Sequence, residues 1–174
     1  MTEICTKRLS GYEDKVPVLV SDRMMDVTKN YVGRTVHMKG CFRSYNENMG
    51  ERFCVRLYVL AKEFEYLDEQ RQVFFENRII LDGFVCKKPI YRRTPLGREI
   101  SDLFIAVNRN SGKSDYFPCV LWGKNAEFAS KLQIGTHIRE YGRIQSRGYE
   151  KQTENGRECR TTYEISVSTI EYMD

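Results

Sequence analysis

The segment from Ser114 to Leu132 reads SDYFPCVLWGKNAEFASKL and contains the only tryptophan of the chain, Trp122. Side chains alternate across a β-strand, so every second residue before this tryptophan belongs to the same face. One set is apolar throughout and forms the predicted core face: Phe117, Cys119 and Leu121. The other set places Tyr116 and Trp122 outward, with Pro118 between them. Two exposed aromatic rings on one strand are unfavourable unless a ligand or a partner covers them.

The chain around this segment contains an internal repeat. The early copy begins EICTKRLSGYEDKVPVLV at Glu3, and the late copy begins FIAVNRNSGKSDYFPCVL at Phe104. The shared positions are Ile4 and Ile105, Arg8 and Arg109, Gly11 and Gly112, Asp14 and Asp115, Pro17 and Pro118, Gly33 and Gly135, and Gly40 and Gly142. The last two pairs follow a shift of one residue, and the copies end on EYLD and EYMD. Shared glycines, prolines and end signatures indicate two equivalent units.

Each unit shows the same order of predicted elements. A short strand, a Ser-Gly turn and a second strand precede a helix-like segment, DRMMDVTKNY (22–31) in the first unit and NAEFASKL (125–132) in the second. Asp22 and Asn125 are the predicted N-caps, and a glycine ends each helix. Two further strands joined by a polar hairpin complete the unit.

The second unit also has a beginning that the first lacks, residues 76–102 (ENRIILDGFVCKKPIYRRTPLGREISD). This stretch predicts one more strand, a basic turn and the start of the next strand. Five strands with one helix between the third and the fourth is the plan of an OB-fold, a small and partly open β-barrel. We therefore predict an all-β chain with one short helix per unit. Residues 1–70 form a partial OB-like unit, residues 71–76 a linker, and residues 77–174 a complete OB-fold domain.

The composition favours a cytoplasmic protein without catalytic activity. No apolar run reaches the roughly 18 residues that a membrane helix needs, and the first residues contain no apolar signal-peptide region. The six cysteines form no CxxC pair, which disfavours a zinc ribbon, and we interpret them as reduced thiols. No HExxH, GxSxG or P-loop motif is present, and His37 and His137 lie in corresponding strands of the two units. We expect no catalytic residue, no cofactor and no metal site.

The excess positive charge lies in the second unit. The net charge is +4; the chain has 12 Lys or Arg and 12 Asp or Glu up to Asn77, but 16 and 12 from Arg78 onward. Some of these cations surround tyrosines, as in KKPIYRRTPLGR around Tyr91 and GRIQSRGYEK around Tyr149. Single-stranded nucleic acids bind such surfaces, because cations contact phosphates and aromatic rings stack on bases. The predicted phosphate-binding residues here are Arg92, Arg93, Arg98, Lys124, Arg143, Arg147 and Lys151.

Residues 77–174 resemble the bacterial single-stranded DNA-binding protein (SSB) family. ILDGFVCKKPIYRRTPLGREISDLFIAVNR (80–109) resembles the family's opening, a hydrophobic strand to a glycine and then a turn with proline, arginine and glycine. DYFPCVLWGKNAEFASKLQIGTHIREYGRIQSRGY (115–149) resembles its central block. The resemblance implies that Tyr116, Trp122 and Tyr149 stack on bases, and we add Tyr91 as a further candidate.

Two features of the sequence depart from the family pattern. The family's fourth stacking aromatic lies in the loop after strand two, but the loop here, NRNSGKSD (108–115), has none. We expect Arg109 and Lys113 to supply charge there instead. Many members also end in a flexible tail with an acidic tip that recruits other replication proteins. This sequence stops at Asp174, right after the last strand, so recruitment through such a tail is not expected.

The first unit lacks the aromatic residues of the second. Lys15, Ser21 and Glu47 stand at its positions equivalent to the three stacking candidates, so we interpret it as a scaffold or assembly unit. Its missing first strand exposes backbone groups of the neighbouring strands. A second copy of the chain, or the segment RQVFFENRIILD (71–82), is a candidate to pair with them. Because the family forms dimers and tetramers, we expect a homo-oligomer.

The predicted function is sequence-independent binding of single-stranded DNA in the nucleoid. Binding would protect single strands in replication, repair or recombination, a choice that the sequence leaves open. One alternative is an OB-fold protein–protein adaptor or primosome-like accessory, in which Trp122 and Tyr149 are buried. Another is RNA binding by the same barrel, because every base offers a π-face and no feature of the sequence predicts contacts to 2′-hydroxyl groups.

Overall fold

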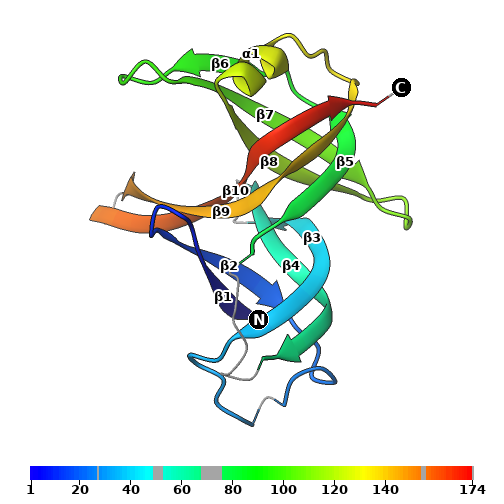
Figure 1. Ribbon diagram of the computed structural model, residues 1–174, viewed down its shortest axis with the longest axis vertical. Helices are drawn as coiled ribbons and strands as arrows, with labels where there is room; N and C mark the ends of the chain where they lie inside the picture. The colour runs from blue at the N-terminus through cyan, green and yellow to red at the C-terminus, as the bar shows by residue number, and fades with distance from the viewer. Residues whose placement is uncertain (27, 49–52, 68–75, 154–155, 174) are drawn as a thin grey trace. The chain divides into compact units, whose positions relative to one another are not determined.

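The computed structural model describes residues 1–26, 28–48, 53–67, 76–153 and 156–173 (Figure 1). For six strand residues it describes the backbone alone: Asn48, Phe53, Cys54, Lys151, Thr153 and Glu158. The chain divides into two compact units, Met1–Glu76 (unit 1) and Asn77–Asp174 (unit 2). The predicted linker, residues 71–76, lies outside the described residues except for Glu76. No helix in the described part of the chain is long and apolar enough to cross a membrane.

Unit 2 is a curled β-sheet with one helix (Figure 1). Its elements are β5 (Ile79–Val85), β6 (Ile90–Arg93), β7 (Glu99–Asn108), β8 (Ser114–Trp122), α1 (Lys124–Ser130), β9 (His137–Thr153) and β10 (Gly156–Tyr172). The strand order is β5-β9-β10-β8-β7-β6, and β5 also pairs with β7. Because β5 has both β9 and β7 as neighbours, the sheet closes into a small barrel. The predicted OB-fold is confirmed, and β6 is an additional strand beside the start of β7.

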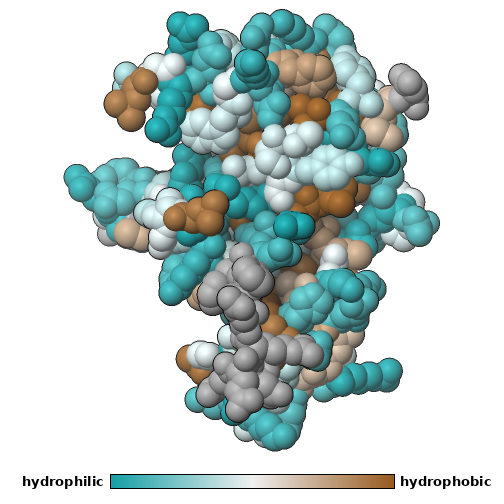
Figure 2. Space-filling view, in the orientation of Figure 1, coloured by the Kyte–Doolittle hydropathy of each residue, from teal (hydrophilic) through white to brown (hydrophobic). Residues whose placement is uncertain are grey.

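Alternate strand positions form the core of this barrel. On β8, Phe117 and Leu121 are fully buried, as the alternation of the sequence predicts. Helix α1 packs against β7 and β8 and buries two small side chains, Ala126 and Ala129. Figure 2 shows a mostly hydrophilic surface with hydrophobic patches between the polar side chains. Further buried residues of the core are Leu81, Val85, Leu103, Ile105, Cys119, Ile138, Ile144, Ile165 and Val167.

Helix α1 begins two residues earlier than the sequence predicts. The N-cap is Gly123, and its positive φ of 56° turns the chain sharply at the end of β8. The predicted N-cap, Asn125, lies instead within the first helical turn, where its side-chain amide donates a hydrogen bond to the Ser168 carbonyl at 2.9 Å. The prediction of Asn125 as N-cap was wrong because a glycine, which has no Cβ, tolerates this turn directly after the strand.

One carboxyl group is buried inside unit 2. Glu140 on β9 is 1% exposed, and neither of its oxygens has a well-formed hydrogen bond within the described residues. Burial raises the pKa of Glu140 to about 7, and the neighbouring Cys119 thiol opposes this shift in part. The group is therefore largely protonated in the folded state at mildly acidic pH.

Unit 1 is a four-stranded sheet with the order β1-β2-β4-β3. Its strands are β1 (Thr2–Lys7), β2 (Glu13–Leu19), β3 (Val36–Asn48) and β4 (Phe53–Tyr66). β2 and β4 run parallel, and the other two pairs are antiparallel. The sheet has the same strand order as β7, β8, β10 and β9 of unit 2.

The strand register repeats between the units. Val18 lies opposite Val59 in the parallel pair of unit 1, and Cys119 lies opposite Ile165 in that of unit 2. The antiparallel pair β3–β4 shifts register next to Gly40, and β9–β10 shifts register at the equivalent Gly142. The repeat in the sequence is therefore a repeat of backbone pairing, including one irregularity.

Gly40 and Gly142 have the same packing environment. A Cβ at Gly40 would collide with the carbonyl oxygen of Leu60, and a Cβ at Gly142 would collide with that of Ser166. Each glycine lets the neighbouring strand cross close to its backbone at the register shift. This shared requirement explains why a glycine occupies the position in both units.

The helix-like segment predicted for unit 1 is not helical in the described residues. Residues 20–26 and 28–35 form turns. The backbone N–H of Thr28 donates to Asp26 Oδ1 at 3.1 Å, and that of Val32 donates to Asn30 Oδ1 at 3.0 Å. Such local side-chain acceptors compete with helical hydrogen bonds.

Candidate nucleic-acid interface

Strand β8 carries the two central aromatic residues on its outer side. Tyr116 and Trp122 are each 41% exposed, although Phe117 and Leu121 between them are buried. Their cross-strand partners on β7 are Ala106 and Ile100. The outward orientation predicted from the alternation of β8 is therefore observed.

The outer face of β8 continues across β10 to β9. Directly paired residues share a face, and Val120 of β8 lies opposite Ser166 of β10, which in turn lies opposite Arg143 of β9. The outward residues of β9 then alternate from Arg143 through Arg147 to Tyr149. Tyr149 is 44% exposed. The sheet thus places Tyr149 on the same face as the two aromatic residues of β8. We call this outer face of β7, β8, β10 and β9 the aromatic face.

Strand β6 divides the remaining candidates between two faces. Arg92 lies opposite Ile100, which is itself opposite Trp122, so Arg92 belongs to the aromatic face. Tyr91 lies opposite Ser101 and points to the other face. Tyr91 is 40% exposed, and a hydrogen bond to Glu99 raises its pKa. The structure therefore does not bring Tyr91 together with the other three aromatic residues.

Three of the predicted phosphate ligands form solvent-exposed pairs with carboxylates. Arg92 Nε donates to Asp102 at 2.9 Å, Arg93 Nη2 donates to Glu99 at 3.0 Å, and Arg147 Nη2 lies 3.7 Å from Glu164.

The pKa of Arg92 indicates that the aromatic face is continuous from β6 to β10. Asp102 raises the pKa of Arg92, and Glu164 on β10 adds to this effect although β7 and β8 lie between the two strands. Exposed ion pairs of this kind are weak in water because solvent screens them. A phosphate group can therefore compete with these carboxylates for the guanidinium groups.

Arg109 is held within the turn between β7 and β8. Its guanidinium forms a bidentate pair with Asp115, with 2.7 Å between Nε and Oδ2, and the Asp115 side chain is fully buried. Arg8 and Asp14 form the same pair in unit 1, where 2.8 Å separates Nε and Oδ2. Unit 1 has none of the three stacking candidates and yet keeps this ion pair. The pair therefore stabilises the turn in both units, and this geometry favours a structural role for Arg109.

Three lysine or arginine side chains extend into solvent beside these elements. Lys113 ends the turn before β8, Lys124 follows Trp122 at the start of α1, and Arg98 ends the turn between β6 and β7. All three are exposed and form no ion pair with another described residue.

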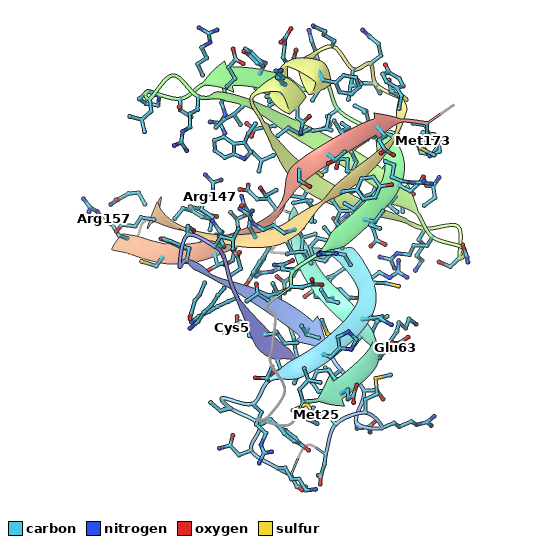
Figure 3. All side chains as sticks on the ribbon, in the orientation of Figure 1. Cys5, Met25, Glu63, Arg147, Arg157 and Met173 are labelled. Carbon is cyan, nitrogen blue, oxygen red and sulfur yellow. The ribbon has the colours of Figure 1, made fainter. Side chains whose placement is uncertain are left out.

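Two predicted phosphate ligands remain on β9, the strand that also carries Arg147 (Figure 3). Arg143 is half-buried; its Nη2 lies 3.4 Å from Gln145 Oε1, and its buried Nε has no acceptor among the described residues. This arginine keeps unused donors next to the outward row of β8. The side chain of Lys151 lies outside the described residues, although its backbone pairs with Glu158.

Phe104 is a member of the aromatic face that sequence reasoning missed. It lies opposite Pro118, and the Lys87 ammonium stands 4.5 Å from its ring centroid. The segment LFIAVN reads as a buried strand, which hid this residue. Its alternation with the buried Leu103 and Ile105 was the signal that could have identified it.

Comparison with known proteins agrees with this geometry. Residues 76–173 match the model of the Single-strand binding protein family, and the chain belongs to that family. The Single-stranded DNA-binding protein B of Bacillus subtilis is 37% identical over 105 residues, which cover 56% of this chain and 90% of that protein. The Single-stranded DNA-binding protein of Bacillus cereus is 33% identical over 105 residues, which cover 56% of this chain but only 60% of that protein.

The fold of the whole chain also has a counterpart among solved structures. The wild-type single-stranded DNA binding protein from Thermus aquaticus superposes with a TM-score of 0.70 at 21% sequence identity. The superposition covers 99% of this chain and 78% of that chain. At this level of identity the likeness concerns the fold, and it extends over both units.

Proposed function

We propose that unit 2 binds single-stranded DNA on the aromatic face, with little dependence on base sequence. The observation that carries this proposal is the presence of three exposed aromatic rings, Tyr116, Trp122 and Tyr149, on one face of an OB-fold barrel. Base stacking on such rings contributes about 1–3 kcal/mol per base, and every base has a π-face. The names of the relatives in Bacillus and Thermus support the same ligand.

The cations around this face contact the phosphates in the proposed complex. Lys124, Lys113 and Arg98 are exposed without ion pairs among the described residues, and Arg143 keeps unused donors. Arg92 and Arg147 exchange their carboxylate partners for phosphates, whereas Arg93 shares the face of Tyr91 on β6 and is not expected to contact the same strand. Because bound cations release counterions from the nucleic acid, the affinity falls steeply as salt rises.

The proposed protein is a binding protein of the bacterial cytoplasm that keeps DNA unpaired during replication, repair or recombination. In common with its family, it is proposed to act as a homo-oligomer, a dimer or a tetramer. The adaptor alternative required buried aromatic residues, but Trp122 and Tyr149 are both more than 40% exposed in the chain. RNA remains a competitor ligand to be compared with DNA in the same assay.

Fluorescence of Trp122 during titration with oligo(dT) tests the proposal. Trp122 is the only tryptophan, so the signal has a single source. Stacking of a base on its ring should quench the emission, and the apparent affinity should fall as salt rises. Unchanged fluorescence together with no shift in a gel would contradict the proposal.

A pair of tyrosine variants tests the assignment of the face. Tyr149 and Tyr91 are 44% and 40% exposed but lie on opposite faces of the sheet. We expect Tyr149→Ala to weaken oligo(dT) binding by about 5-fold to 150-fold, the equivalent of one stacked base. Tyr91→Ala serves as the matched control and should leave the affinity within about twofold. Equal losses in both variants would show that the binding path does not follow the aromatic face.

A further inference from the structure

A long interval separates the two aromatic residues of the aromatic face that lie on β8. Trp122 follows Tyr116 by six residues, so their side chains leave the strand about 20 Å apart. The residues of the same row between them, Pro118 and Val120, carry no aromatic ring. A nucleic acid strand that contacts both rings spans this interval, and a further ring beside it can stack on an intervening base.

Phe104 supplies such a ring from the neighbouring strand, β7. It lies directly opposite Pro118 and therefore belongs to the same face. Tyr116 is its diagonal neighbour across the strand pair, at a distance of about 7–8 Å. Leu103 and Ile105 on either side of Phe104 are 2% and 0% exposed, whereas Phe104 itself is only half-buried. The alternation of β7 thus turns this one large apolar side chain towards solvent.

The segment that follows β5 holds a lysine against this ring. The backbone N–H of Cys86 donates to the Phe104 carbonyl oxygen at 2.9 Å, and the Cys86 thiol donates to the same oxygen at 3.2 Å. These hydrogen bonds fix the next residue, Lys87, beside Phe104, and its ammonium lies 4.5 Å from the ring centroid. Lys87 is exposed and forms no ion pair with another described residue.

The cation–π contact covers the ring without blocking it permanently. Such a contact at an exposed site is worth a factor of about two to five in an equilibrium constant. One stacked base is worth about 5-fold to 150-fold. A base can therefore take the place of the ammonium over the Phe104 ring. The displaced ammonium stays tethered next to Cys86, where a phosphate of the same nucleic acid strand can receive its charge.

We propose that Phe104 is a further base-stacking residue of unit 2 and that Lys87 caps its ring in the unbound protein. On binding, a base replaces the ammonium over the ring, and Lys87 contacts a neighbouring phosphate. This proposal rests on the proposed binding of single-stranded DNA. It extends the binding surface from β8 across β7 to the segment between β5 and β6, which the three aromatic residues named above do not include.

Variants of Phe104 test the stacking, with the affinity for labelled oligo(dT) measured by anisotropy at several salt concentrations. Phe104→Ala and Phe104→Leu should each weaken binding about 3-fold to 30-fold, because neither side chain has a π-face. Phe104→Tyr keeps the ring and should bind within about twofold of the parental protein. No charge is removed, so the slope of log affinity against log salt should not change.

Leucine retains most of the apolar volume, so its comparison with tyrosine separates the ring from packing. Parental affinity in Phe104→Leu would overturn the proposal. An equal loss in Phe104→Tyr and Phe104→Ala would assign the effect to packing and would also contradict it.

A pair of lysine variants tests the cap. Lys87→Gln should decrease the slope of log affinity against log salt by about one unit, because one phosphate contact is lost. Lys88→Gln is the matched control, since it removes the adjacent exposed charge and should leave the slope unchanged. An equal decrease in both variants would reflect the overall charge of the segment and would contradict the specific role of Lys87.

Quenching of Trp122 by oligo(dT) separates a failure of this proposal from a failure of the proposed function. Quenching in the parental protein together with unchanged affinity in Phe104→Leu would leave DNA binding in place and exclude Phe104 from it. Absence of quenching and of binding in the parental protein would overturn both proposals. Thermal unfolding of each variant, expected to match that of the parental protein, confirms that an affinity loss does not come from an unfolded unit 2.

Discussion

Unit 1 and unit 2 share a backbone plan but differ in what they present to solvent. Both have the same strand order, the same parallel pair, the same register shift beside a glycine and the same arginine–aspartate pair in the first turn. The three aromatic residues of unit 2 are replaced in unit 1 by Lys15, Ser21 and Glu47. The comparison shows that the two units share inward residues and turn residues, whereas a small set of outward residues distinguishes the proposed binding face of unit 2 from the equivalent face of unit 1.

Exchanging these outward residues should have the largest effect on binding. The triple variant Tyr116→Lys, Trp122→Ser and Tyr149→Glu gives unit 2 the residues of unit 1 at all three positions. We expect its affinity for oligo(dT) to fall about 100-fold or more, because three stacking platforms are lost. Anisotropy of labelled oligo(dT) measures the affinity, and circular dichroism should show an unchanged sheet. Near-parental affinity would mean that the aromatic face is not the binding site.

The arginine–aspartate pair should matter for stability in both units. Arg109→Ala leaves the fully buried Asp115 carboxylate without its guanidinium partner, and we expect a loss of about 3 kcal/mol in the free energy of unfolding. Arg8→Ala should have a comparable effect in unit 1, where Asp14 is equally buried. Denaturant unfolding measures both losses. A stable Arg109→Ala protein with strongly weakened DNA binding would instead assign Arg109 to phosphate binding.

The core of unit 2 should respond to pH through Glu140, whereas unit 1 has Met38 at the equivalent position. The folded state holds the pKa of Glu140 at about 7, above its ordinary value of 4.5. The folded protein therefore binds more protons than the unfolded chain between these pH values. Stability should therefore fall as pH rises from about 4.5 to 7, by about 3 kcal/mol, and then remain level.

The variants Glu140→Gln and Glu140→Met should remove this pH dependence, because neither side chain titrates. Thermal unfolding across the pH range measures the effect, and methionine at this position copies unit 1. A parental pH profile in both variants would show that Glu140 is not the titrating group.

The smallest predicted effect concerns a single cation. Lys124→Gln removes an exposed charge that has no ion pair among the described residues. We expect the slope of log affinity against log salt to decrease by about one unit, without a change in stability. The control Lys15→Gln removes an exposed lysine of unit 1 and should leave the slope unchanged. An equal change in both variants would extend the DNA-binding surface to unit 1.

Several features of the aromatic face were predictable because they depend on local pattern. The alternation of β8 was sufficient to identify Phe117 and Leu121 as core and Tyr116 and Trp122 as exposed. Tyr91 was harder, because its face depends on the pairing of β6 with β7. A shift of one residue in that pairing moves a side chain to the opposite side of the sheet. Phe104 was missed for a related reason, since its strand reads as continuous core.

The role of Arg109 also required the structure. Its repetition as Arg8, together with Asp14 and Asp115, was visible in the sequence. The repeated pair could have indicated a structural ion pair, because the stacking aromatics do not repeat. What no spacing revealed was that both carboxylates are buried while the guanidinium groups remain partly exposed.

The sequence by itself determined the repeat, the order of the strands along the chain and the outward position of the aromatic residues on β8. These features follow from periodicity and from glycine and proline positions, which act over a few residues. Only the tertiary structure decided that Tyr149 joins the face of Trp122 and that Tyr91 does not. It also decided that β3 has only β4 as a neighbour among the described strands, whereas β9 lies between β5 and β10. Strand neighbours and register are contacts between residues that are distant in sequence, and packing of the whole sheet selects them.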